Sequence, residues 1–336
     1  MFTRLITLIV LASSFSLYAK PLKIMQYNIE NSFDTTFDDG TDDFTYLPVA
    51  TKRSMKGHAD FCRSLGSQFY KDQCLNLDWN EAKFTKKLLG IARVIKSFDV
   101  SGKGPDIIFV QEVENKNVLS KLVSKGLSGM GYQHIALLEG DDKRGIDVGI
   151  ISRFPIVNSQ IHSLIINGNR IDTRGILEVE LRVEDQKVVL FNNHWPSQGN
   201  PTSHRVASAE QLSKLAERHT QSADLILAAG DFNTIESEVP YPLSFLKNFE
   251  DVVALARKAG YTLHPGTHFF KGEWGSLDRV FVHKASAIKP KLSSVEIMNR
   301  DFVLKKEQGA MVPNRFDFVT AEGFSDHLGI AVEFSY

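Results

Sequence analysis

The chain has 336 residues, 43% of them hydrophobic and 24% charged, a composition that allows a large buried core and excludes an intrinsically disordered protein. The formal net charge of -1 excludes a global basic field for nucleic acid, so any attraction for phosphate must be local or supplied by a metal. No linker rich in proline, glycine or serine divides the chain, and we expect one domain over residues 20–336.

Residues 1–19 have the pattern of a secretory signal peptide. Arg4 gives a positive start, a mostly apolar core follows, and the segment ends in the small residue Ala19. A membrane anchor is the alternative, but the apolar core is short for a bilayer and two serines interrupt it. We therefore expect cleavage after Ala19, no membrane anchor in the mature protein, and a secreted or periplasmic location.

The mature chain is predicted to begin with a strand at Leu22–Tyr27 and to continue into a long irregular segment, residues 31–80. This segment contains the run Asp-Asp-Gly-Thr-Asp-Asp at 38–43 and both cysteines, Cys62 and Cys74. An oxidising compartment would join the two cysteines, whereas a zinc site would need further ligands that no nearby Cys/His pair supplies. Because long loops in compact domains cover a site or carry their own ties, the disulfide would be such a tie.

Helices and strands then alternate along the chain. Apolar residues at helical spacing predict helices at about 80–98, 117–125 and 203–219. Strands are predicted at Ile107–Val110, Val148–Ser152, Ile176–Val183, Lys187–Asn192, Leu225–Ala229, Arg279–His283 and Leu328–Phe334. The third and fourth of these form a hairpin with its turn at Glu184-Asp185. Strand–helix–strand occurs once in each half, which predicts an α/β fold with two layers packed sheet to sheet and helices outside.

Short polar strings recur along the chain, most of them directly after an apolar run. They are Asn28-Ile29-Glu30, Gln111-Glu112, Asn193-His194-Trp195, Gly230-Asp231-Phe232-Asn233 and Ser325-Asp326-His327. Taken alone, Glu112 could be a charge at a helix N-terminus, and Gly-Asp-Phe-Asn could be an ordinary turn. However, α/β sheets place ligand groups at the carboxyl ends of strands, and carboxylate and amide oxygens suit a hard cation. The strings together predict one catalytic site assembled from distant segments.

His194 and His327 are the candidate proton-transfer groups. A lone histidine is more often a structural hydrogen-bonding group. Hydrolysis of a phosphodiester, however, needs one group to activate or orient water and another to protonate the leaving oxygen. Each histidine would need a carboxylate to fix its tautomer, and the candidates are Asp147 and Asp278, each of which opens a predicted strand. The alternative for both is a solvated charge at a strand start.

These residues resemble the motifs of the endonuclease/exonuclease/phosphatase superfamily, which includes pancreatic-type deoxyribonucleases, apurinic endonucleases, sphingomyelinases and inositol polyphosphate phosphatases. The matching pieces are Gln-Tyr-Asn-Ile-Glu-Asn at 26–31, Val-Gln-Glu-Val at 110–113, Arg-Gly-Ile-Asp-Val-Gly-Ile-Ile-Ser at 144–152, Asn-Asn-His-Trp-Pro-Ser at 192–197, Gly-Asp-Phe-Asn at 230–233, Leu-Asp-Arg-Val at 277–280 and Ser-Asp-His at 325–327. They occur in family order and are most similar to secreted bacterial nuclease-like members. The resemblance implies a four-layer sandwich, with two packed mixed β-sheets flanked by helices.

The resemblance also implies roles for the polar residues. Glu112 would be the principal ligand of Mg²⁺, or of Mn²⁺ as an alternative. The other implied metal-site residues are Glu30, Asn28 and, at the rim, Asp326. Asp231 and Asn233 would bind the scissile phosphate and the attacking water. His327 with Asp278, and His194 with Asp147, would be the acid–base couples, and which histidine is the acid is left open.

Further residues are expected at the substrate. Arg144 would steady the phosphate, and Trp274 would either stack on a base or pack in the core. A local basic rim is expected from Arg144, Lys143, Arg170, Arg174 and Arg205. The 31–80 insertion is not part of the minimal family core and would cover or extend the groove.

The sequence therefore predicts a secreted, magnesium-dependent phosphodiesterase, first of all an endonuclease that hydrolyses DNA, with nucleic acid as substrate and no stable protein partner. One alternative is a phosphohydrolase of the same fold that acts on a lipid headgroup or a sugar phosphate. The other is a non-catalytic binding module, which the loss of either histidine or of Glu112 would have indicated.

Overall fold

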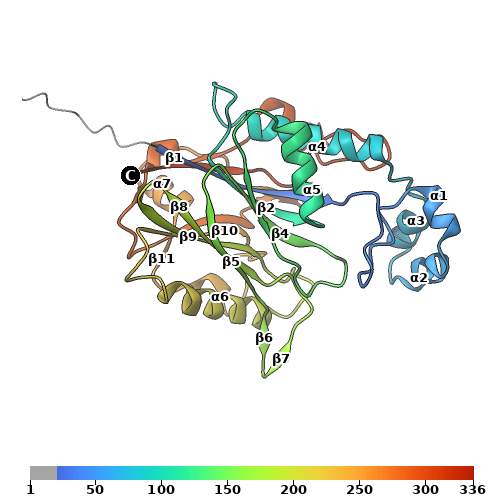
Figure 1. The fold of residues 1–336 in the computed structure, drawn as a ribbon, viewed down its shortest axis with the longest axis horizontal. Helices are drawn as coiled ribbons and strands as arrows, with labels where there is room; N and C mark the ends of the chain where they lie inside the picture. Colours follow the sequence, from blue (N-terminus) through green and yellow to red (C-terminus); the bar gives the residue numbers. More distant parts are fainter. Residues whose placement is uncertain (1–20) are drawn as a thin grey trace, which may run out of the picture.

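The computed structural model describes residues 21–336, so the expected signal peptide lies outside the described residues. Two mixed β-sheets form the centre of the molecule (Figure 1). In order across the first sheet, the strands are β15 (Lys289–Pro290), β19 (Ile330–Ser335), β1 (Pro21–Ser32), β2 (Ile107–Val113), β4 (Asp147–Ser152) and β3 (His134–Leu137), with β16 (Glu296–Ile297) also paired to β19. The second sheet runs β11 (Phe249–Asp251), β14 (Asp278–His283), β10 (Leu225–Asp231), β9 (Gln186–His194), β8 (Ile176–Val183) and β5 (Ile156–His162).

Helices lie on the outer faces of the two sheets (Figure 1). On the side of the first sheet these are α4 (Glu81–Lys96) and α5 (Lys116–Lys121), the latter continued by a π-helical turn at Leu122–Gly126. On the outer face of the second sheet lies α6 (Thr202–Glu217), whereas α7 (Val252–Lys258) buries its apolar side chains in the same cluster as Val280 and Val282 of β14. The predicted α/β sandwich of two packed mixed sheets flanked by helices is therefore confirmed.

The alternation of side chains along the strands separates two hydrophobic layers. On β10, Leu225 and Leu227 point into the core that the two sheets share, whereas Ile226 packs against α6. Successive strand residues face opposite sides of a sheet, so a fully apolar strand must be covered on both. The helix predicted at about 80–98 is observed as α4, with Asn80 as its N-cap. The Asn80 side chain accepts hydrogen bonds from the backbone N–H groups of Ala82 and Lys83.

The sequence predicted an irregular segment at residues 31–80, but part of this insertion is helical. It contains three short helices, α1 (Val49–Ser54), α2 (His58–Ser64) and α3 (Gln68–Asn76), which lie together at one end of the molecule (Figure 1). Helices of one or two turns are too short to show a hydrophobic period, which is why the sequence pattern missed them. A disulfide between Cys62 and Cys74 links α2 to α3. The buried Trp79 follows α3, and its indole N–H donates to the Phe33 carbonyl.

Three small two-stranded ribbons complete the strands of the described part of the chain. They are β6 (Ile165–Ile166) with β7 (Asn169–Arg170), β12 (His268–Phe270) with β13 (Glu273–Gly275), and β17 (Leu304–Glu307) with β18 (Ala310–Pro313). Within residues 21–336, no helix is both long enough and apolar enough to cross a membrane.

The disulfide gives a first testable prediction. Replacing Cys62 and Cys74 together with serine should lower the free energy of unfolding by roughly 2–3 kcal/mol, because the bond closes a short loop in the unfolded chain. Urea denaturation of the variant and the parent measures the difference. The folded variant should keep its activity. Two free thiols in protein purified from an oxidising compartment would contradict the bond.

Candidate functional site

The polar strings meet at one edge of the sandwich because of strand register. In the first sheet, Asn28 of β1 lies beside Gln111 of the parallel strand β2. In the second sheet, Asp231 of β10 lies between His194 of β9 and Asp278 of β14. Parallel neighbours end at the same edge, so the carboxyl ends of four strands present their side chains together.

His327 and Asp278 form a buried acid–base couple. The Nδ1 atom of His327 donates to Oδ2 of Asp278 over 2.7 Å, and the Nε2 atom of Gln26 donates to the other carboxylate oxygen over 2.7 Å. Burial alone would lower the pKa of His327, but Asp278, with help from Asp326 and Asp231, raises it well above its ordinary value. The imidazole is thus held as a cation with Nε2 directed away from Asp278.

Asp231 is the centre toward which the other polar groups point. Its Oδ2 accepts the Asn28 amide over 3.2 Å and lies 3.7 Å from Nε2 of His194 and 3.9 Å from Nε2 of His327. Its Oδ1 accepts the backbone N–H of Asn233 over 2.9 Å. Burial raises the pKa of Asp231 to about 7, and the His327 cation opposes this rise. Both predicted histidines therefore converge on one carboxylate.

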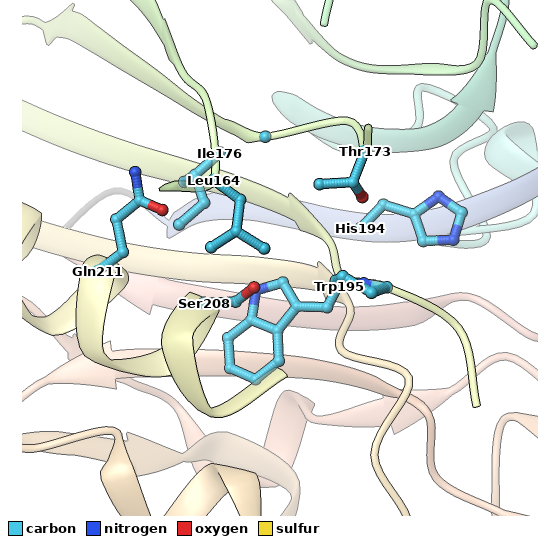
Figure 2. A pocket seen from close by; sticks show the side chains of 9 residues that line it. Leu164, Thr173, Ile176, His194, Trp195, Ser208 and Gln211 are labelled. Carbon is cyan, nitrogen blue, oxygen red and sulfur yellow. The ribbon is translucent and has the colours of Figure 1, made fainter. Parts of the chain in front are cut away.

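His194 is buried, but it does not pair with Asp147 as predicted. Its Nε2 lies 3.9 Å from Oε1 of Glu112, and its Nδ1 has no hydrogen-bond partner among the described residues. Figure 2 shows His194 beside Thr173 and Trp195 in the wall of a small pocket. Burial, reinforced by Arg174, lowers the pKa of His194 well below its ordinary value, so the ring is neutral.

Asp147 is engaged elsewhere, which explains the missing pair. Its Oδ1 accepts the backbone N–H of Gly140 over 2.8 Å, and its carboxyl group also bonds that of Glu139. Burial and then Glu139 raise the pKa of Asp147 to about 9, so this carboxyl group is protonated at neutral pH. The couple of His194 with Asp147 is corrected to a neutral histidine that faces Glu112 and Asp231.

The four predicted metal-site residues lie around one corner of the site. The Asn28 amide donates to Oε1 of Glu112 over 3.2 Å, and Oε2 of Glu112 accepts the backbone N–H of Asn31. Glu30 and Glu112 have positive φ angles of 51° and 60°, which turn these strand ends out of regular extension. Oε2 of Glu30 and Oδ1 of Asp326 are buried with no hydrogen-bond donor among the described residues. These unpartnered oxygens fit a hard divalent cation.

Two cations at this corner were missed by sequence reasoning. Arg315 pairs with Glu30 through Nε and lies 3.6 Å from Asp326. The buried Lys87 donates to the Phe324 carbonyl, and its charge also acts on Glu30 and Asp326. Burial and then Asp326 raise the pKa of Glu30 to about 7, while Lys87 and Arg315 oppose this. Neither cation stands in a polar string at a strand end, so no sequence signal marked them.

A polar network beneath the site was also missed, although its signal was present. Gln26 donates to Gln111, Gln111 donates to Asn192, and Asn192 donates to the carbonyls of Val110 and Gly149. Amides inside otherwise apolar strands are costly to bury unless they are bonded to one another, so their presence in these strands could have indicated this network. Through Gln26 the network fixes Asp278.

His268 is a third histidine at the site. Its backbone pairs with that of His327 in an isolated antiparallel β-bridge, and the centroids of the two rings lie 4.8 Å apart. Burial, then the His327 cation, lowers the pKa of His268 to about 4, so it is neutral beside the His327–Asp278 couple.

The predicted basic rim is only partly present. Arg174 and Arg205 are buried, where Arg174 binds Asp142 and the Trp195 carbonyl, and Arg205 binds Glu238. Buried guanidinium groups require partners, so these two arginines serve the structure rather than a substrate surface. Arg144, Lys143 and Arg170 remain exposed at the surface, each close to an aspartate. Trp274 is half-buried and packs against His264 and Phe269.

The fold and the motifs that build the site are those of one protein family. Residues 70–335 match the Endonuclease/Exonuclease/phosphatase family, and the chain belongs to this family. Enzymes of the family hydrolyse phosphodiester bonds and generally use divalent metal ions.

A curated relative is an inositol phosphosphingolipids phospholipase C of Schizosaccharomyces pombe, 28% identical over 155 residues, which are 41% of this chain and 35% of that protein. The match thus spans about a third of that relative.

Solved structures share the fold at low identity. TDP2 of D. rerio in complex with a single-strand DNA product aligns with TM-score 0.53 and 18% identity over 94% of this chain and 99% of that chain. A family protein of Bacteroides thetaiotaomicron aligns with TM-score 0.57 and 16% identity over 95% and 96%. Beta toxin of Staphylococcus aureus aligns with TM-score 0.53 and 16% identity over 93% and 99%.

Proposed function

We propose that this family member is a magnesium-dependent phosphodiesterase that hydrolyses DNA. The observation that carries the reaction class is the convergence of a cationic His327 and a neutral His194 on the buried Asp231, beside unpartnered carboxylate oxygens. Two histidines in different charge states suit a reaction that must both orient or activate water and protonate a leaving oxygen. Carboxylate and amide oxygens favour Mg²⁺ or Mn²⁺ over zinc.

Glu112, Glu30 and Asn28 would hold the metal, with Asp326 at the rim. When bound, the metal would neutralise charge that develops on the phosphoryl oxygens. Asn233, fixed by its bonds to Asp231 and to the Trp195 carbonyl, would hold the scissile phosphate. These contacts would hold the ester beside the histidine pair.

The proton transfers follow from the charge states of the histidines. His327 carries its second proton on Nε2, because Nδ1 is bound to Asp278, and Nε2 would donate that proton to the leaving oxygen. His194 is neutral and would orient the attacking water or accept its proton near Asp231. We therefore propose His327 as the acid, a choice that the sequence left open.

DNA as the substrate is supported by the motif resemblance to secreted nuclease-like proteins and by the fold shared with a TDP2 that was solved with a DNA product. We also propose that the mature enzyme acts in the periplasm or outside the cell. The signal-peptide pattern of residues 1–19 and the motif resemblance to secreted proteins support this location.

A lipid phosphodiester is a second candidate, favoured by one structural observation. The β12–β13 ribbon carries the largely exposed side chain of Phe270. Two residues before it, the backbone of His268 pairs with that of His327. An exposed aromatic side chain beside a catalytic site suits an apolar substrate or surface. The fission yeast relative that resembles this chain is named for a phosphosphingolipid.

A substrate panel distinguishes the two candidates. The full mature protein is incubated with duplex DNA, single-stranded DNA, RNA and vesicles that contain phosphosphingolipid, each with magnesium and with chelator. We expect magnesium-dependent cleavage of duplex DNA that weakens as salt rises, because binding a run of phosphates releases counterions. Cleavage of the lipid alone would replace the nuclease proposal with the second candidate. Failure on every phosphodiester would overturn both.

A further inference from the structure

The two ring nitrogens of His194 face different surroundings. Nε2 faces the site, 3.7 Å from Oδ2 of Asp231 and 3.9 Å from Oε1 of Glu112. Nδ1 is buried and has no hydrogen-bond partner among the described residues. In His327, by contrast, Nδ1 is bound to Asp278. One histidine of the site is thus fixed by a carboxylate, and the other is not.

The tautomer of His194 decides what its ring can do. In the proposed function, on which this inference rests, His194 orients the attacking water or accepts its proton. Nε2 must then carry a lone pair, and the ring proton must be on Nδ1. A buried N–H group without an acceptor is costly. Without an acceptor at Nδ1, the proton would move to Nε2, which faces the carboxylates of Asp231 and Glu112. The proposed role therefore requires an acceptor beside Nδ1.

A small cavity borders His194 on the side of α6 (Figure 2). Its volume is about 10 Å³, enough for one water molecule. The side chains of Thr173, Ser208 and Gln211 in its wall carry oxygens that can accept a hydrogen bond. The Ser208 hydroxyl already donates to the His204 carbonyl. Figure 2 shows Gln211 across the cavity from His194. Thr173 is the group that remains.

The hydroxyl group of Thr173 meets the requirement. Thr173 is 4% exposed, and its Oγ1 has no hydrogen-bond partner among the described residues. It lies beside His194 in the wall of the same cavity (Figure 2). A buried hydroxyl needs a partner as a buried N–H does. Two unpartnered polar groups, Nδ1 of His194 and Oγ1 of Thr173, therefore border one cavity that has room for one water molecule.

The chain around Thr173 is firmly held. The next residue, Arg174, is buried, and its Nη2 donates to the Trp195 carbonyl over 3.0 Å. Gly175 follows with a φ angle of 75°, and a Cβ atom there would lie 2.7 Å from the carbonyl oxygen of His162. Only glycine allows the chain to pass this close. A hydroxyl on such a constrained segment is suited to positioning another side chain.

We propose that Thr173 is a positioning residue for His194 and acts through one water molecule in this cavity. The water would accept a hydrogen bond from Nδ1–H of His194 and donate one to Oγ1 of Thr173. This bridge would take the place predicted for Asp147, whose carboxylate accepts the backbone N–H of Gly140 instead. A neutral partner fixes the tautomer without favouring the charged ring, whereas Asp278 favours the cation of His327.

NMR spectroscopy of the mature protein tests this role directly. Long-range ¹H–¹⁵N spectra of protein labelled with ¹⁵N-histidine give the tautomer of each ring, and His194→Gln identifies the signals of His194. We expect the proton on Nδ1 in the wild type and in Thr173→Ser, which keeps the hydroxyl. In Thr173→Val, which keeps the shape of the side chain but lacks the hydroxyl, the proton should move to Nε2. Thr220→Val, which removes a surface hydroxyl beyond α6, should match the wild type.

Turnover gives a second measurement on the same variants. Thr173→Val should lower kcat on duplex DNA about tenfold with KM unchanged, which corresponds to one hydrogen bond of about 1.4 kcal/mol. Thr173→Ser should keep most of the activity. A proton on Nε2 of His194 in the wild type would overturn the inference, whether or not any variant folds. A wild-type spectrum in folded Thr173→Val would overturn it too. The spectra need no substrate, so the inference and the proposed function can fail separately.

Discussion

Replacing His327 with alanine should lower turnover by about two orders of magnitude or more, the scale expected when a general acid is removed. The physical reason is that His327 is the charged imidazole at the site, held over 2.7 Å by Asp278 and directed at Asp231. Initial rates of phosphodiester hydrolysis at saturating magnesium give the effect, and Tm shows whether the variant is folded. His134→Ala, on the edge strand β3 and away from the site, is the matched control and should keep wild-type turnover.

Asp278→Asn tests the same couple through pH. In the wild type the pKa of His327 is raised by Asp278, so the acid form persists across neutral pH. Without that charge the pKa of His327 falls, and the alkaline limb of the rate profile should move to lower pH. Stability has the matching sign: because the folded pKa is raised, the pair stabilises the fold fully below pH 6.5, and the effect is lost as pH rises through the folded pKa. An unchanged profile in a folded variant would remove His327 from the acid role.

The sequence predicted that these polar residues gather at one edge because its signals are local and redundant. Buried strands read as short apolar runs, and parallel neighbours must end at the same edge, so polar residues such as Glu112 and Asp231 could be brought together without a structure. Strand reasoning offered Asp278 as a candidate orienter because it opens a strand, and the family resemblance implied its pairing with His327, which the 2.7 Å hydrogen bond shows.

The predictions that were wrong or missing all concern side chains whose partners are distant in sequence or are set by the fold. The sequence shows that Asp147 opens a strand, but not that Glu139 bonds its carboxyl group. It shows that Arg174 is basic, but not that Asp142 draws it into the interior. Arg315 reaches Glu30 from 285 residues further along the chain, and no local pattern encodes a pair at that separation. Charge partners and burial are therefore what the structure adds to the motifs.

Replacing Glu112, the proposed metal ligand, should have an effect at least as large as the loss of His327. Glu112→Gln keeps the size of the side chain but replaces a carboxylate with a neutral amide, next to Asn28 and Glu30. If the metal contributes about 4 kcal/mol to the stabilisation of the transition state, turnover should fall roughly a thousandfold. Chelator should abolish hydrolysis by the wild type, and magnesium or manganese should restore it, with zinc less effective because all the ligands are oxygens.

Binding measurements separate this metal effect from a general loss of structure. Calorimetric titration with Mn²⁺ should show weaker binding to Glu112→Gln than to the wild type, while Glu81→Gln, a surface carboxylate at the start of α4, should bind as the wild type does. A shift in metal affinity together with the fall in turnover assigns Glu112 to the metal, because a purely structural residue would lower Tm without changing the affinity of the folded fraction. Full hydrolysis by the wild type in excess chelator would refute the metal-dependent reaction, and the two histidines would then have to act on the phosphate without a cation.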